Sequence, residues 1–196
     1  MKLKFYLLKL TLLVWAVVFT VGYYVYIFIY VLEILKPQHI SAQIFFAVNF
    51  HLIWGLMVWS LVACTFIAIP KPPDKFEVPP DLADEIDRLS LQGMENFNEI
   101  QELLNNFINS RQLNIKTLDY QTNGIRYCLS CKVVKPDRAH HCQVCGVCVL
   151  RMDHHCPAVA CCVHYKNTKF FLLFTFWASM LCIYSVITVA PFFPWS

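Results

Sequence analysis

The stretch from Cys128 to Cys162, CLSCKVVKPDRAHHCQVCGVCVLRMDHHCPAVACC, decides the fold of this chain. It holds eight of the ten cysteines, with four histidines among them. Cysteine pairs separated by two residues occur at Cys128 and Cys131, Cys142 and Cys145, and Cys145 and Cys148. Two-residue spacing lets both thiolates of a knuckle reach one tetrahedral ion at ~2.3 Å. Several such pairs with interleaved histidines predict a zinc-binding module.

This module offers more metal ligands than two zinc ions use. The candidates are Cys128, Cys131, His140, His141, Cys142, Cys145, Cys148, His154, His155, Cys156, Cys161 and Cys162. Two closed tetrahedral sites use only part of this set. A nucleophilic cysteine has to be spared by zinc, and Cys156 is a good candidate. Its neighbours are Asp153, His154 and His155, and such a neighbourhood supplies a base for a thiol nucleophile.

The chain as a whole is too apolar for an ordinary soluble domain, with 58% hydrophobic residues and a mean hydropathy of +0.50. Three long apolar runs exceed the ~20 residues that cross ~30 Å of hydrocarbon. We predict transmembrane helices at residues 5–35, 44–69 and 169–193. The first run has a basic start, as a signal peptide does. Its apolar part is about twice the length of a signal-peptide core, so we expect a retained anchor.

The distribution of lysine and arginine predicts the orientation. Between residues 70 and 169 lie twelve of the sixteen basic residues. The positive-inside rule therefore places residues 1–4 and 70–168 in the cytosol, and residues 36–43 and 194–196 in the lumen. Cytosolic thiols stay reduced, which favours metal binding or catalysis over disulfides. The mild net charge of +3 gives no indication of a nucleic-acid partner.

Residues 70–125 are predicted to form a cytosolic linker that contains an amphipathic helix over 81–112. Its apolar residues recur at intervals of three, four or seven and give one apolar face, with a break expected near Gly93. We interpret it as a helix that packs over the cysteine-rich module at 126–168. A membrane-surface helix is the alternative, but its polar face is acidic rather than basic.

The predicted fold class is therefore a mainly α, polytopic membrane protein. Three transmembrane helices are expected, with a cytosolic two-zinc cysteine-rich domain between the second and the third. Short β-hairpins or knuckles are expected to build that domain.

The motif residues resemble those of the DHHC family of zinc-finger protein S-acyltransferases, the palmitoyltransferases. The resemblance is carried by Cys128, Cys131, Lys135, Pro136, Asp137, Arg138, His141, Cys142, Cys145, Cys148, Met152, Asp153, His154, His155, Cys156, Pro157, Cys162, Asn167 and Phe171. It implies two structural zinc ions, each held by three cysteines and one histidine. The implied sets are Cys128, Cys131, His141 and Cys148, and Cys142, Cys145, His155 and Cys162.

The same resemblance implies the chemistry. His154 would take the thiol proton, Asp153 would orient the imidazole, and Cys156 would carry the acyl group between acyl-CoA and substrate cysteines. The candidates to meet CoA phosphates are Arg126, Lys135, Arg138 and His140, against the alternative of a solvated basic face. Expected partners are membrane lipids, acyl-CoA such as palmitoyl-CoA, and proteins with cysteines near the membrane. The expected location is a secretory-pathway membrane: Golgi, endoplasmic reticulum or plasma membrane.

Two features depart from the family pattern. After the DHHC tetrad the family has Pro-Trp, two Asn, then Cys-Val-Gly, whereas residues 157–164 here read PAVACCVH. A missing indole and missing amides predict lower stability or activity beside the nucleophile. The family also has at least four crossings, so we expect three helices to leave the acyl cavity open on one side. The alternative function is a catalytically impaired relative that acts as a zinc-stabilised membrane adaptor or regulator; a generic zinc-finger module would leave the membrane helices unexplained.

Overall fold

The computed structural model describes residues 2–34 and 40–192. The chain divides into two compact units. The helical unit consists of residues 1–67 and 156–196, and the cysteine-rich unit consists of residues 68–155. The chain passes from one to the other between His155 and Cys156. Residue 1, part of the predicted loop at 36–43 and the predicted end at 194–196 lie outside the described residues.

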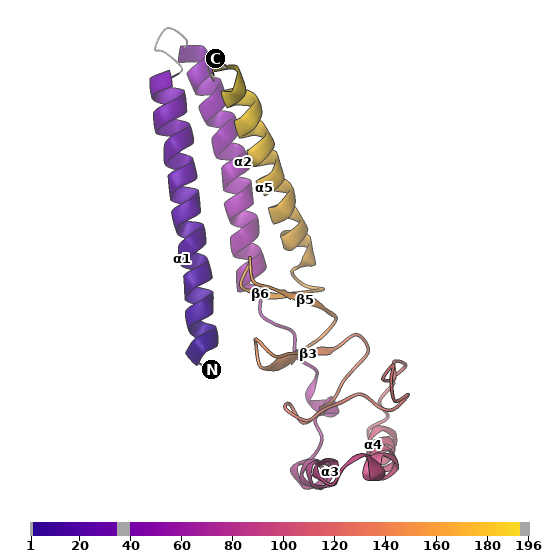
Figure 1. Ribbon diagram of the computed structural model, residues 1–196. Helices are drawn as coiled ribbons and strands as arrows, with labels where there is room; N and C mark the ends of the chain where they lie inside the picture. Colours follow the sequence, from indigo (N-terminus) through magenta and orange to yellow (C-terminus); the bar gives the residue numbers. More distant parts are fainter. Residues whose placement is uncertain (1, 35–39, 193–196) are drawn as a thin grey trace. The chain divides into compact units, whose positions relative to one another are not determined.

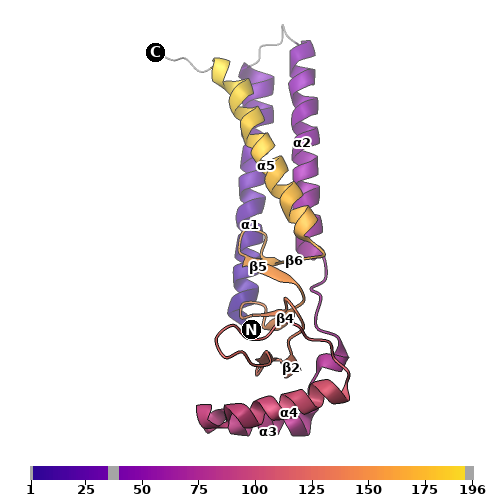
Figure 2. The same ribbon diagram turned by 90° about the vertical axis from the view of Figure 1, so that its right-hand side faces the viewer.

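The helical unit is built from three long apolar helices (Figures 1 and 2). Its elements are α1 (Lys2–Tyr24), η1 (Val25–Ile34), α2 (Ile40–Phe66), β6 (Cys161–His164), α5 (Thr168–Val189) and η5 (Ala190–Phe192). The segments long and apolar enough to cross a membrane are Leu13–Ile34, Ile40–Phe66 and Thr168–Val189. The prediction of three membrane helices is thereby confirmed by length and composition.

The second helix is shifted towards the N-terminus relative to the predicted run of 44–69. Among the described residues it begins at Ile40, and its Gln43 donates from Nε2 to the Val31 carbonyl at 2.9 Å. It ends at Phe66, shortly before Pro70, which disfavours helical backbone in the residue before it. Within this unit α2 and α5 run side by side in both views (Figures 1 and 2).

Two apolar clusters hold these helices together. Near η1, the Tyr26 ring stacks on Phe50 with centroids 4.2 Å apart, and the Tyr26 hydroxyl meets Thr188 Oγ1 at 3.0 Å. This satisfies a phenol that hydrocarbon could not hydrogen-bond. The other cluster consists of Met57, Leu61, Cys64, Val159, Cys161, Val163 and Phe174, and we call it the lower cluster.

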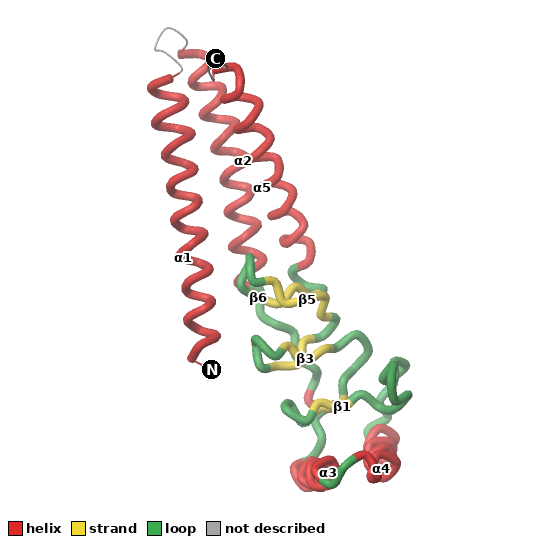
Figure 3. The backbone as a smooth tube through the Cα atoms, viewed as in Figure 1, coloured by secondary structure: helices red, strands yellow, loops and turns green. Residues whose placement is uncertain are grey.

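The cysteine-rich unit combines two amphipathic helices with short antiparallel strand pairs (Figure 3). Its elements are η3 (Asp74–Phe76), α3 (Pro80–Leu91), η4 (Met94–Asn96), α4 (Phe97–Ser110), β1 (Tyr127–Cys128), β2 (Val133–Val134), β3 (His140–Cys142), β4 (Val147–Val149) and most of β5 (Met152–Cys156). Strand β1 pairs with β2, and β3 with β4, in which His141 lies opposite Cys148. Strand pairs and Cys/His clusters confirm the predicted type of module.

The predicted helix at 81–112 is two helices, with the break at Gly93. Pro80 opens α3 at a position where its missing N–H loses no bond. Gly93 then adopts a φ of 112°, which L side chains rarely allow, and the chain restarts as α4.

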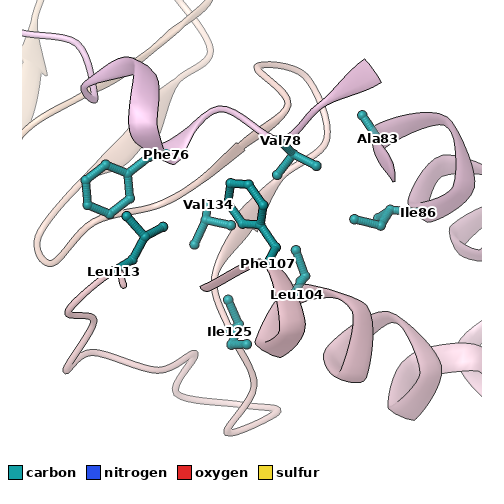
Figure 4. Packing of buried hydrophobic residues seen from close by; sticks show 9 residues of the cluster. All are labelled: Phe76, Val78, Ala83, Ile86, Leu104, Phe107, Leu113, Ile125 and Val134. Atoms are coloured by element: carbon teal, nitrogen blue, oxygen red, sulfur yellow. The ribbon is translucent and has the colours of Figure 1, made fainter. Parts of the chain in front are cut away.

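The two helices of the cysteine-rich unit share one core (Figure 4). Ile86 on α3 and Leu104 on α4 are almost completely buried. They pack with Phe76, Val78, Ala83, Phe107, Leu113, Ile125 and Val134. Since Val134 belongs to β2, the core fixes the first hairpin against the helices.

Candidate metal centre and active site

The first cluster of metal ligands consists of Cys128, Cys131, His141 and Cys148, whose ligand atoms all lie within 4.8 Å of one another. His141 Nδ1 lies 3.5, 3.2 and 3.9 Å from the sulfurs of Cys128, Cys131 and Cys148. The β1–β2 turn supplies the first two thiols, and the register of β3 and β4 places His141 opposite Cys148.

The chemistry of this donor set fits zinc. Three thiols and one imidazole form a closed tetrahedral set of the kind that zinc prefers. Burial, and then the neighbouring Cys128 and Cys131, raise the pKa of the Cys148 thiol well above its ordinary value. A bound dication reverses this penalty because it stabilises thiolates. Cys148 is 2% exposed, so the cluster is closed to solvent on that side.

A second group of ligands lies in the same unit. The sulfurs of Cys142 and Cys145 lie 3.6 and 3.5 Å from His155 Nδ1. The Cys145 N–H also points at the Cys142 sulfur at 3.3 Å, and Gly146 donates to the Cys142 carbonyl at 2.7 Å with a φ of 70°. This is the tight turn that brings both thiols of a knuckle to one side. The predicted fourth ligand, Cys162, is fully buried in β6 of the helical unit.

Asp153 and His154 form a hydrogen-bonded pair beside the second group. His154 Nδ1 lies 3.1 Å from Asp153 Oδ2, and both side chains are substantially exposed. Neighbouring residues of a strand project from opposite faces, so His154 and His155 point to different sides of β5. The thiols of Cys142 and Cys145 lie on the side of His155.

Cys156 belongs to the helical unit and packs against the lower cluster. The residues that follow it are held from outside their own segment. The Trp15 indole N–H donates to the Ala158 carbonyl, and the Thr65 hydroxyl donates to the Val159 carbonyl at 3.2 Å. Sequence reasoning missed both residues, and neither has a local pattern that would have indicated the contact.

Asn167 completes this set of contacts and is completely buried. Its Oδ1 accepts the His164 N–H at 2.7 Å. Its Nδ2 donates to the carbonyls of Cys162 at 2.9 Å and Cys64 at 3.1 Å. The sequence indicates Asn167 only as part of a motif, whereas in the structure it joins α2, β6 and the start of α5.

The residues that depart from the family pattern are accommodated in the lower cluster and its surroundings. The Cys161 thiol is buried and donates to the Cys64 carbonyl at 3.6 Å. His164 is completely buried and accepts the Lys166 N–H at Nδ1, 3.3 Å away. Its Nε2 has no hydrogen-bond partner among the residues described. Burial lowers the pKa of His164, so the imidazole is neutral at physiological pH.

Three of the four predicted phosphate-binding residues lie near one another. Burial lowers the pKa of His140, and the nearby charges of Arg126 and Lys135 lower it further. Arg126 also donates from Nη2 to the Ala139 carbonyl at 2.6 Å, which fixes its guanidinium. Arg138 is exposed and has a φ of 60°. The arrangement concentrates positive charge on one part of the cysteine-rich unit, as an anionic ligand requires.

The family-model match and the relatives found by comparison with known proteins agree with one another. Residues 121–195 match the family model described as DHHC palmitoyltransferase. Over 173 residues the chain is 33% identical to palmitoyltransferase ZDHHC20 of Homo sapiens, an alignment that covers 88% of the chain and 45% of the relative. Identity to palmitoyltransferase ZDHHC15 of Xenopus laevis is 34%, covering 88% and 48%, and to ZDHHC2 of Rattus norvegicus 32%, covering 88% and 45%. The chain spans about half the length of the curated relatives it matches.

Proposed function

We propose that the chain is a membrane-bound protein S-acyltransferase, because residues 121–195 match the family model described as DHHC palmitoyltransferase. It would move a long-chain acyl group, such as palmitoyl, from acyl-CoA to cysteines of other proteins. The observation that carries this proposal is the Asp153–His154 hydrogen bond of 3.1 Å, two residues before the Cys156 thiol. A metal module alone needs no such pair.

The first step loads Cys156. Asp153 orients the imidazole through Nδ1, so Nε2 of His154 takes the thiol proton. The Cys156 thiolate attacks the thioester carbonyl of acyl-CoA. A carbon–sulfur bond forms to Cys156, the bond to the CoA sulfur breaks, and CoA leaves as a thiol with the proton from His154.

The second step unloads the acyl group. The thiol of a protein substrate gives its proton to His154, its sulfur attacks the Cys156 thioester, and Cys156 leaves as a thiol. One thioester is exchanged for another, so no ATP is needed. The membrane helices would accept the acyl chain and limit protein substrates to those with cysteines near the bilayer. The membrane would belong to the secretory pathway, with the cysteine-rich unit on its cytosolic side.

Zinc has a structural role in this proposal. Cys128, Cys131, His141 and Cys148 hold one ion, and Cys162 joins Cys142, Cys145 and His155 at the other. With all four positions filled, each ion supplies folding free energy rather than a site for substrate. His155 is thereby used by metal, and Asp153, His154 and Cys156 are spared.

The phosphates of CoA are assigned to Arg126, Lys135 and His140, with Arg138 as an exposed addition. The contact between Lys135 and Arg126, whose backbone N–H and carbonyl oxygen lie 2.7 Å apart, supports this assignment. A phosphate is bound best where several donors converge, and the Arg126 guanidinium is held by its hydrogen bond to the Ala139 carbonyl.

The test is direct acylation. The purified chain in lipid nanodiscs is incubated with labelled palmitoyl-CoA, and the label that hydroxylamine releases is counted. We expect label on the unmodified chain, none on Cys156→Ser, and full label on Cys182→Ser, the matched control at an exposed thiol of α5. Label that persists in Cys156→Ser contradicts the assignment. A chain that binds two zinc ions and takes no label, where a full-length relative does, would support the adaptor function instead.

A further inference from the structure

The backbone that follows Cys156 is held by side chains of α1, of α2 and of the residue that precedes α5, all within the helical unit. Trp15 on α1 binds the carbonyl of Ala158, and Thr65 on α2 binds that of Val159. Asn167, the residue that precedes α5, binds that of Cys162. We propose that Trp15, Thr65 and Asn167 are positioning residues that set the path of residues 157–162 and thereby the placement of the Cys156 thiol. This inference rests on the proposed acyl transfer and identifies what supports its nucleophile.

Trp15 is the least expected member of this set. Its indole ring stacks on Phe19 at 5.1 Å and meets Phe174 edge-on at 5.9 Å. These contacts fix the ring plane, so the N–H direction is determined before it reaches Ala158. An indole N–H is a donor only, and it matches a carbonyl that no strand partner takes. Trp15 also packs on the lower cluster, as Cys156 does.

Thr65 makes its contact near the end of α2. Its Oγ1 lies 2.9 Å from the Leu61 carbonyl of its own helix and 3.2 Å from the Val159 carbonyl. The single hydroxyl proton is shared between the two acceptors, so the link to Val159 is weaker than a full bond. Val159 is 1% exposed, and a carbonyl at this depth needs a donor.

The contacts reach the nucleophile through the backbone. Residues 157–160 turn tightly, with Ala160 at a φ of 54° and its N–H bonded to the Pro157 carbonyl at 3.2 Å. A left-handed alanine is strained and keeps this conformation only when neighbouring contacts impose it. The two carbonyls that precede Ala160 are bound by side chains of α1 and α2, so loss of either donor relaxes the turn next to Cys156.

The test measures acylation kinetics in Trp15→Phe, which keeps an aromatic ring and removes the N–H. Losing one hydrogen bond that positions a nucleophile is expected to lower the kcat of Cys156 acylation about 3- to 10-fold, with the KM for palmitoyl-CoA nearly unchanged. Trp54→Phe is the matched control. Trp54 packs on the same lower cluster, but its buried Nε1 has no hydrogen-bond partner in the described part of the chain.

Thr65 supplies a second variant with a rescue. Thr65→Val keeps the shape and removes the hydroxyl, and is expected to lower kcat about 2- to 5-fold, whereas Thr65→Ser restores it. If Thr65 had only a structural role, Thr65→Val and Thr65→Ser would have the same kcat when their thermal stabilities are equal. Equal kcat in Trp15→Phe, Thr65→Val and the unmodified chain would overturn the proposal.

Amide hydrogen exchange of residues 157–163 separates this proposal from the acyltransferase function. Trp15→Phe is expected to speed exchange at Ala160, and Trp54→Phe is not. If the unmodified chain takes no acyl label but exchange still rises in Trp15→Phe, the acyltransferase function fails and the positioning of the segment stands. If label is normal and neither exchange nor kcat responds to Trp15→Phe, the positioning fails alone.

Discussion

Asn167→Asp is expected to destabilise the helical unit strongly, although the two side chains have the same shape. Oδ1 still accepts the His164 N–H. The second carboxylate oxygen then replaces Nδ2 and faces the Cys162 and Cys64 carbonyls at 2.9 and 3.1 Å, so acceptor meets acceptor. Because Asn167 is completely buried, water cannot separate them.

The magnitude follows from the two carbonyls that lose the Nδ2 donor. An unsatisfied buried acceptor costs about 1–3 kcal/mol; the Cys162 carbonyl loses this in full and the Cys64 carbonyl, which keeps the weak thiol donor of Cys161, only in part. Burial of the carboxylate adds to this, so the total is about 3–5 kcal/mol. This exceeds the effect of most single substitutions. For a chain of this size it corresponds to a fall of roughly 6–20 °C in the unfolding midpoint.

The assay is thermal unfolding of the zinc-loaded chain in nanodiscs, followed by tryptophan fluorescence. The matched control is Asn105→Asp, which introduces the same charge at an exposed position of α4. A midpoint for Asn167→Asp within about 2 °C of this control would refute the reasoning, because the Nδ2 hydrogen bonds would then contribute nothing.

Three further results are expected. Leu104→Ala should lower the free energy of unfolding of the cysteine-rich unit by about 2–5 kcal/mol in a denaturant titration, because Leu104 is 0% exposed. Leu91→Ala is the control: Leu91 is 88% exposed, so the same free energy should change by less than ~0.5 kcal/mol. Burial opposes ionisation of Asp137, but the Thr117 and Lys116 N–H groups outweigh it and lower its pKa. Because the pKa of Asp137 is lower in the folded state, its ionised carboxylate stabilises the fold at any pH above the unfolded-state pKa, and this stability is lost as the pH falls through the folded-state pKa. The loss in free energy of unfolding caused by Asp137→Asn, about 1 kcal/mol, should therefore be equal at about pH 6 and pH 8. Metal analysis should give about two zinc per chain and about one in Cys148→Ser, and chelation should unfold the cysteine-rich unit by circular dichroism.

The membrane helices and the metal clusters were predictable because their signals are local. An uncharged apolar run needs no partner to be interpreted as a membrane span, and two-residue cysteine spacing contains the geometry of a knuckle. The helix over 81–112 was predictable in its apolar face, since Ile86 and Leu104 both lie in one core. Its division into two helices depends on a single residue, Gly93, whose left-handed backbone interrupts a pattern that otherwise continues.

The support of the nucleophile was not predictable, because it depends on contacts between distant parts of the chain. Trp15 and Ala158 are 143 residues apart in sequence, and Thr65 and Val159 are 94 apart. No periodicity relates them. A tryptophan near the start of a membrane helix is ordinarily interpreted as an interfacial anchor, so the sequence gives no indication that its N–H binds a distant carbonyl.

These contacts also bear on the departures at residues 158–164. The missing indole and amides predict lower stability beside the nucleophile, yet the carbonyls of Ala158, Val159 and Cys162 each accept a hydrogen bond from a side chain outside this segment. The small side chains of Ala158 and Ala160 therefore have little effect on the path of this segment, which is set by hydrogen bonds from other parts of the chain. Among the replacements, the completely buried His164 retains a desolvation penalty, because its Nε2 has no hydrogen-bond partner in the described part of the chain. Any loss of stability from these departures should consequently be traced to His164 before it is traced to the missing indole beside Cys156.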